Sequence, residues 1–130
     1  MRTIKSLNDL NIPDNYRIYI THYLTNLKRN KFFHHVNKII LFGSCAREAV
    51  RDFSDIDIFL ITDIELKEKD ELSLLFDPVP YKIGNIYIPM DILLQSQEQY
   101  NLCKDELCMV QRFVEKEGII LNELFRFSRI

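Results

Sequence analysis

The sequence has three cysteines, no long apolar run and little excess charge, and each of these shortages excludes a class of protein. Cys45, Cys103 and Cys108 form neither a CxxC pair nor the Cys/His spacing of a zinc site. No segment approaches the roughly 18 consecutive apolar residues of a membrane span. Because the cysteine count is odd and no signal peptide is visible, we expect a protein of the reducing cytoplasm.

The charge balance excludes proteins that coat nucleic acids or lie on membrane surfaces, because these need an excess of positive charge. Lys and Arg number 17 and Asp and Glu number 19, for a formal net charge of −2. We therefore expect no membrane partner and no strong nucleic-acid binding. The charge balance does not exclude binding of one small nucleotide.

The length and the apolar content predict one packed domain. The chain has 130 residues, of which 47% are hydrophobic, and no repeat, low-complexity tract or Gly/Ser-rich linker interrupts it. Within residues 1–130 we expect an N-terminal helix and connector over residues 1–37 and a core that carries the site over residues 38–94. A C-terminal helix with a short tail is expected over residues 95–130.

Hydrophobic periodicity predicts an α/β (α+β) domain. Apolar residues at spacings of three and four indicate an amphipathic helix that begins near Pro13 and includes Leu27. A short edge strand is expected after Gly118, where the last helix ends. Longer strands are predicted over residues 38–42, 55–62 and 86–94. Further helices are predicted over residues 44–52, 65–76 and 97–116. This order of elements indicates a small mixed β-sheet flanked by helices.

Two aspartates stand at the head of the second predicted strand, in the stretch "SDIDIFLI". Residues two apart on a strand point to the same face, so Asp55 and Asp57 project together and away from Ile56 and Ile58. Their carboxylates repel each other unless a positive charge lies between them. Oxygen ligands without a neighbouring Cys or His favour Mg²⁺ or Mn²⁺ over zinc. The pair is therefore a candidate metal site, with a solvent-screened pair at a strand end as the alternative.

A Gly-Ser pair follows the first predicted strand. Gly43 allows the backbone to approach a ligand closely. Ser44 begins the predicted short helix, whose N–H groups and positive dipole end suit a phosphate. Arg47 lies on the same face of that helix and offers a charge-assisted contact to the phosphate, or else pairs with Asp52. If the first two strands are antiparallel neighbours, this pair meets the aspartates at one site.

Asp91 is the only acidic residue inside the third predicted strand. A charge within an apolar run is costly unless it is paired or functional. If this strand lies beside the strand of Asp57, Asp91 can ligate a second metal ion or accept the proton of an attacking hydroxyl. The alternative is an edge-strand aspartate that faces water. A phosphate cradle beside such carboxylates is what a nucleoside triphosphate with Mg²⁺ requires.

The stretch "LFGSCAREAVRDFSDIDIFLI" resembles the signature of the DNA polymerase beta-like nucleotidyltransferase superfamily, which has Gly-Ser, a short helix, Asp-x-Asp and a third Asp on a later strand. The short chain and the ending "VEKEGIILNELF" resemble the minimal nucleotidyltransferases, the MNT group. The resemblance spans roughly residues 39–121 and implies the polymerase beta-like fold. It also implies roles for five residues: triphosphate binding by Gly43 and Ser44, Mg²⁺ ligation by Asp55 and Asp57, and a third carboxylate at Asp91.

One position departs from the pattern of the family. Family members often have Gly after the Arg of this motif, and this chain has Glu48. Because Glu disfavours a left-handed turn, we expect the short helix to continue past this position and the loop before Ser54 to differ.

The resemblance implies that ATP is the nucleotide substrate and that AMP is transferred to an acceptor hydroxyl while pyrophosphate leaves. Minimal nucleotidyltransferases are commonly paired with a HEPN-family ribonuclease toxin, which they adenylylate as antitoxins. It therefore implies a HEPN-family partner and a hetero-oligomer with that toxin. Two alternatives stay open: an antitoxin that acts by occlusion alone, and a small-molecule nucleotidyltransferase of the aminoglycoside or lincosamide type.

Overall fold

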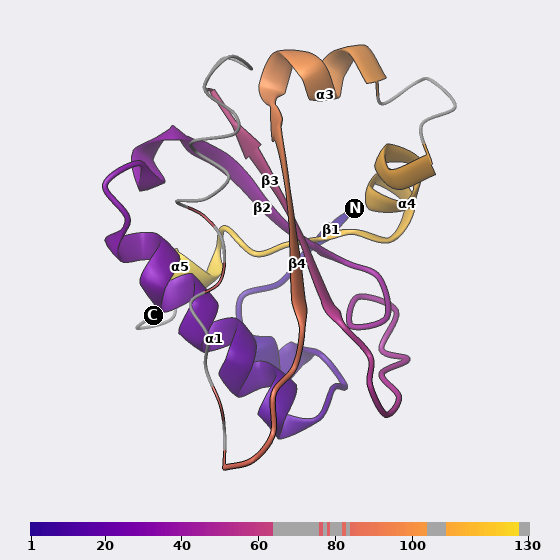
Figure 1. Cartoon of the computed structure of the whole chain (residues 1–130). Helices are drawn as coiled ribbons and strands as arrows, with labels where there is room; N and C mark the ends of the chain where they lie inside the picture. Colours follow the sequence, from indigo (N-terminus) through magenta and orange to yellow (C-terminus); the bar gives the residue numbers. More distant parts are fainter. Residues whose placement is uncertain (64–75, 77, 79–81, 83, 104–108, 128–130) are drawn as a thin grey trace.

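In the computed structural model of the chain, residues 1–63, 76, 78, 82, 84–103 and 109–127 are described, and they form a mixed β-sheet with helices on both faces (Figure 1). The five-stranded sheet has the order β1-β5-β2-β3-β4. Its strands are β1 (Arg2–Thr3), β2 (Val36–Phe42), β3 (Ile56–Thr62), β4 (Met90–Ser96) and β5 (Ile119–Ile120). The helices are η1 (Leu7–Asp9), α1 (Asp14–Arg29), η2 (Phe33–His35), α3 (Gln97–Cys103), α4 (Met109–Glu117) and α5 (Leu124–Phe127). The predicted small mixed sheet flanked by helices is confirmed.

The three central strands meet at one end of the sheet. β2 runs antiparallel to β3 with Phe42 opposite Asp57, and β4 runs parallel to β3 with Asp91 opposite Asp57. The last residues of β2 therefore lie beside the first residues of β3 and β4. Both pairings agree with the arrangement that the sequence required for a shared site.

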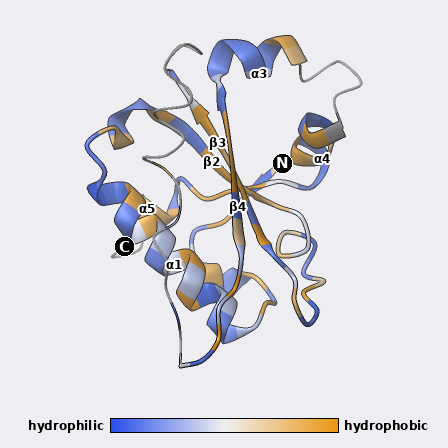
Figure 2. Cartoon of the chain, in the orientation of Figure 1, coloured by the Kyte–Doolittle hydropathy of each residue, from blue (hydrophilic) through white to orange (hydrophobic). Residues whose placement is uncertain are grey.

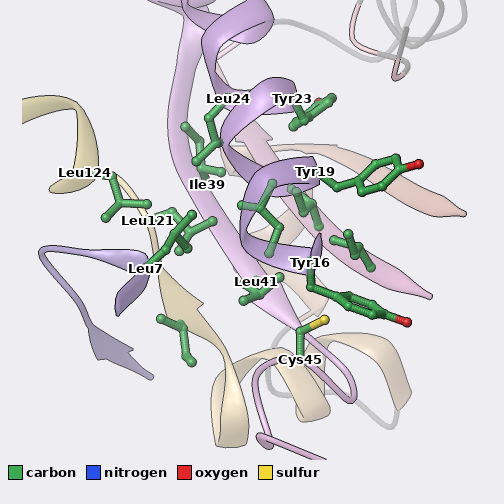
Figure 3. Close-up of a cluster of buried hydrophobic side chains, with 14 of the residues drawn as sticks. Leu7, Tyr16, Tyr19, Tyr23, Leu24, Ile39, Leu41, Cys45, Leu121 and Leu124 are labelled. Carbon is green, nitrogen blue, oxygen red and sulfur yellow. The ribbon is translucent and has the colours of Figure 1, made fainter. Parts of the chain in front are cut away.

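α1 covers one face of the sheet, as its apolar spacing predicts. Its buried residues pack on side chains that alternate along β3. In the hydropathy colouring the strands are mostly apolar, and α1 carries both apolar and polar residues (Figure 2). Three tyrosines of α1 also donate their hydroxyls to backbone carbonyls of distant segments: Tyr16 to Ser54 at 2.6 Å, Tyr23 to Phe76 at 2.8 Å, and Tyr19 to Ile86. The helix thus fixes the chain just before β3 and at two positions between β3 and β4. Figure 3 shows the three tyrosines on α1.

The opposite face of the sheet carries a smaller core. Ile40, Phe59, Ile61, Tyr100 and Val114 form it, with side chains from β2, β3, α3 and α4. Because side chains alternate along a strand, Asp57, the second residue of β3, points to this same face. Asp57 lies near the end of the sheet and is not part of the smaller core.

Three predictions about the elements are wrong: where the third strand begins, whether the last long helix is continuous, and whether the last strand lies at the edge of the sheet. The third predicted strand, over residues 86–94, begins later, at Met90 in β4. The single helix predicted over residues 97–116 is instead α3 and α4, which run in different directions (Figure 1). The strand predicted after Gly118 is β5, but it is internal because the unpredicted β1 pairs with it at the edge. The helix predicted over residues 65–76 lies outside the described residues, apart from residue 76.

The predicted short helix over residues 44–52 is also wrong, because residues 43–48 form hydrogen-bonded turns. Glu48 adopts the left-handed conformation, with φ 56°, that we expected it to avoid. Its carboxylate accepts the Asn11 N–H at 3.2 Å and lies 3.5 Å from the Arg2 guanidinium. These contacts to the N-terminal segment hold a conformation that glutamate does not favour by itself, so the chain turns where a helix would continue.

Within the described part of the chain, no helix has the length and apolar character that crossing a membrane requires.

Candidate active site

Three carboxylates from neighbouring strands lie at one end of the sheet. Asp57 on β3 and Asp91 on β4 are register partners, and register partners of a parallel pair point to the same face. Asp55 directly precedes β3, and its charge acts on the Asp57 carboxyl. The structure thus brings together the three aspartates that the sequence singled out.

The Asp57 carboxyl group is strongly affected by its surroundings. Its pKa is raised to about 6, first by burial and then by the negative charges of Asp91 and Asp55, while Arg47 lowers it. A partly buried carboxylate that faces two others is unfavourable near neutral pH. A divalent cation would offset this repulsion, so the chemistry of the donor set fits Mg²⁺ or Mn²⁺.

The carboxylates do not enclose a metal ion by themselves. Among the residues that the structure describes, no group of three or more His, Cys, Asp or Glu side chains has the arrangement of a metal site. Mg²⁺ is usually held by one or two carboxylates together with water and substrate phosphates, rather than by a cage of protein ligands. The arrangement therefore suits a cation that is bound together with a nucleotide.

The Gly-Ser turn lies directly over the carboxylates. Gly43 has φ 74°, a left-handed conformation that favours glycine, and a Cβ atom at this position would collide with the Asp57 carboxylate. The Gly43 carbonyl accepts the Arg47 N–H at 3.1 Å, and the Ser44 carbonyl accepts the Ala49 N–H at 2.9 Å. A phosphate at Gly43 and Ser44 would therefore meet a tight turn, not the helix N-terminus that the sequence predicted.

Arg47 pairs with Glu117, a residue that the sequence analysis missed. Its Nη1 donates to Glu117 Oε1 at 2.8 Å, and the Glu117 side chain is only 19% exposed. Asp52, the partner that we considered from spacing, is not the one that the structure pairs with it. The two partners are 70 positions apart in the sequence, so no local signal predicts this contact. Arg47 is thus held at the end of α4, close enough to Asp57 to lower its pKa.

Cys45 adjoins the site but is not ionised at neutral pH. Burial, and then the negative charge of Asp57, raise the pKa of its thiol to about 12, although a hydrogen bond with Ser44 lowers it. The side chain is fully buried beside Tyr16 at the end of β2 (Figure 3). Cys45 is therefore a packing residue and not a nucleophile.

A match to a protein-family model agrees with this geometry. The sequence model of the family described as "Nucleotidyltransferase domain" matches residues 25–121. Among curated proteins, none matches the sequence. A crystal structure at 1.40 Å resolution of a "putative nucleotidyltransferase" from Sulfolobus solfataricus is 18% identical and superposes with a TM-score of 0.41, over 78% of this chain and 84% of that one.

Proposed function

Because this chain belongs to the nucleotidyltransferase domain family, we propose that it transfers AMP from ATP to an acceptor hydroxyl with the help of Mg²⁺ or Mn²⁺. The observation that carries this proposal is the register pairing of Asp57 with Asp91 beneath the Gly43 turn. It supports the proposal because acidic side chains and a backbone that allows close approach, the two requirements of a metal-bound triphosphate, lie at the same end of the sheet.

Each residue of the site has a distinct role in the proposed reaction. Asp55 and Asp57 would hold the metal ion, which neutralises charge on the phosphates when it is bound. Gly43 and Ser44 bind the terminal phosphates, and Arg47 adds a charge-assisted contact. Asp91 would ligate a second metal ion or accept the proton of the acceptor hydroxyl. A bond forms between the acceptor oxygen and the α-phosphorus, the bond to the bridging oxygen breaks, and pyrophosphate leaves.

We propose further that the acceptor is a HEPN-family toxin, and that this chain acts in the cytoplasm as its antitoxin in a hetero-oligomer. The support is the resemblance of the ending "VEKEGIILNELF" to the MNT group, together with the resemblance of "GSCAREAVRDFSDID" to the signature of the wider superfamily. An antitoxin that acts by occlusion requires the same partner but no intact site. The paired carboxylates at Asp57 and Asp91 favour the catalytic version.

Label transfer tests this proposal. With Mg²⁺ and a HEPN-family protein, wild-type protein should transfer label from [α-³²P]ATP to that protein, and [γ-³²P]ATP should give none. Asp91→Asn should lower the rate by about 100-fold or more, because general-base catalysis contributes about 10²–10⁴-fold. Its dissociation constant for the HEPN-family protein should stay unchanged. If wild-type protein binds the partner but transfers no label, it acts by occlusion.

Glu117→Gln should weaken Mg-ATP binding about 3–10-fold, with a smaller effect on kcat, because Arg47 loses the charged partner that orients it while the side-chain size is kept. Titration calorimetry with a non-hydrolysable ATP analogue measures the change. Glu98→Gln on α3, at the far end of β4, is the matched control and should have no effect. Tighter nucleotide binding by Glu117→Gln would show instead that Glu117 competes with the phosphates for Arg47.

A further inference from the structure

We propose that Glu48 is a positioning residue for nucleotide binding. Through its carboxylate, the N-terminal segment (residues 2–12) holds the Gly-Ser turn in the conformation that presents Gly43, Ser44 and Arg47 to the phosphates. This inference rests on the proposed function, and it assigns a role to a residue that the proposed reaction does not use. Glu48 directly follows Arg47, so its backbone conformation sets the course of the chain at the end of the turn.

The hydrogen bonds of the turn require a left-handed residue at the position of Glu48. The Glu48 N–H donates to the Cys45 carbonyl at 3.2 Å, and the Ala49 N–H donates to the Ser44 carbonyl at 2.9 Å. These two bonds form the pattern of a Schellman motif, in which the residue before the last donor is left-handed and is usually glycine. Glu48 fills that place with φ 56°, a conformation that is unfavourable for a residue with a Cβ atom. The turn that contains Ser44 therefore depends on contacts that hold Glu48 in this conformation.

The main contact is made by a donor that is itself firmly held. The Glu48 carboxylate accepts the Asn11 N–H at 3.2 Å. Asn11 lies between Leu10 and Ile12, whose side chains are both buried in the larger core. The Arg17 guanidinium on α1 also donates to the Leu10 carbonyl at 2.6 Å. Because the core and α1 fix the backbone around Asn11, this N–H offers the Glu48 carboxylate a fixed point of attachment.

A second route joins Glu48 to the residue that pairs with Arg47. The Arg2 guanidinium lies 3.5 Å from the Glu48 carboxylate, and the Arg2 N–H donates to the Gly118 carbonyl at 3.1 Å. Gly118 directly follows Glu117, the partner of Arg47, so β1 lies beside the end of α4 (Figure 1). The two consecutive turn residues are thus attached to two consecutive residues after α4, one directly and one through Arg2.

This arrangement orders the turn before a nucleotide arrives. A binding surface that is already in its bound conformation loses less conformational entropy when the ligand binds. Without the carboxylate of Glu48, the turn would sample other conformations, and Ser44 and Arg47 would have to be ordered again by each nucleotide. We therefore expect the loss of the Glu48 contacts to weaken nucleotide binding, whether or not the protein becomes less stable.

Two substitutions of Glu48 separate positioning from stability. Glu48→Ala loses the contacts and keeps the left-handed strain, so Tm should fall by about 2–6 °C. Glu48→Gly loses the same contacts but relieves the strain, so its Tm should stay within about 2 °C of wild type. The dissociation constant for Mg²⁺ with a non-hydrolysable ATP analogue, measured by calorimetry, should nevertheless rise about 5–10-fold in both variants.

The conservative variant tests which contact positions the turn. Glu48→Gln keeps a side-chain oxygen that accepts the Asn11 N–H, and it should bind the analogue within twofold of wild type. The lost ion pair with Arg2 should matter little, because both side chains are partly exposed. Hydrogen exchange of the Ala49 N–H, which needs no nucleotide, should be about 10-fold faster in Glu48→Ala and unchanged in Glu48→Gln.

Phe53→Gly is the matched control for the relief of strain. Phe53 is also left-handed, with φ 67°, and its side chain is 96% exposed. Its replacement by glycine should raise Tm by about 2–5 °C and leave the dissociation constant of the analogue unchanged.

The outcomes separate this inference from the proposed function. If wild-type protein and both Glu48→Ala and Glu48→Gly bind the analogue equally, the positioning role is overturned and the transferase is left intact. Weaker binding by Glu48→Ala alone, in step with its lower Tm, would also overturn it, because glycine would then suffice without the contacts. Failure of wild-type protein to bind the analogue would overturn the inference and the proposed function together.

Discussion

Asp57→Asn should abolish nucleotidyl transfer and, at the same time, make the protein more stable in metal-free buffer. We expect the rate to fall by about 10³-fold or more, because the variant loses the carboxylate that faces both Asp91 and Asp55. The free energy of unfolding at pH 7 should rise by about 1–2 kcal/mol, a value reduced from the full pKa shift because Asp57 is only partly buried. Label transfer and urea denaturation measure the two effects.

The pH dependence of stability follows from the sign of the same shift. The pKa of Asp57 rises from 3.8 to about 6 on folding, so between these values the folded state binds more protons than the unfolded state. The stabilising contribution of this group is complete below pH 3.8 and is lost as pH rises through about 6. The stability advantage of Asp57→Asn should therefore grow from pH 4 to pH 6.5 and then level off.

With Mg²⁺ and nucleotide present, wild-type protein should become more stable than Asp57→Asn, the reverse of their order in metal-free buffer. Mg²⁺ with a non-hydrolysable ATP analogue should raise the Tm of wild-type protein and have little effect on Asp57→Asn, because a ligand that binds only the folded state stabilises it. Asp9→Asn, at an exposed position in η1, is the control and should respond to Mg²⁺ as wild-type protein does. If Asp57→Asn is less stable than wild type at pH 7 without metal, the charges around the Asp57 carboxylate do not destabilise the folded state.

The carboxylates could be predicted from the sequence because their signal is local. Asp55 and Asp57 stand two apart at the start of an apolar run, and Asp91 interrupts another. Alternation along a strand then fixes the face to which each side chain points, without knowledge of the rest of the chain. The structure adds the register that sets Asp57 opposite Asp91, which depends on strand pairing and which no spacing in the sequence encodes.

The course of the chain between the Gly-Ser pair and the aspartates could not be predicted in the same way. Local propensity favours a helix there, and Glu48 is a good helix former. Its left-handed conformation is held by Arg2 and Asn11, both more than 35 residues away in sequence. A tertiary contact thus overrides the local preference for a helix. The partner of Arg47 is likewise set by the tertiary structure, because Glu117 is distant in the sequence.

Gly43→Ala should cost about 2–4 kcal/mol of unfolding free energy and remove most activity, because two effects add at this position. The left-handed φ of 74° is strained for alanine, and the new Cβ would collide with the Asp57 carboxylate. Gly84→Ala is the matched control, since Gly84 has φ 62° with nothing within 4 Å of a Cβ, and it should cost only about 1 kcal/mol. In an Asp57→Ala background, Gly43→Ala should recover the part of its cost that comes from the collision, which denaturant unfolding of the double-mutant cycle measures. Equal costs at the two glycines would show that the Gly43 turn does not press on Asp57. The proposed close approach of a phosphate-binding turn to a metal-binding carboxylate would then have to be abandoned.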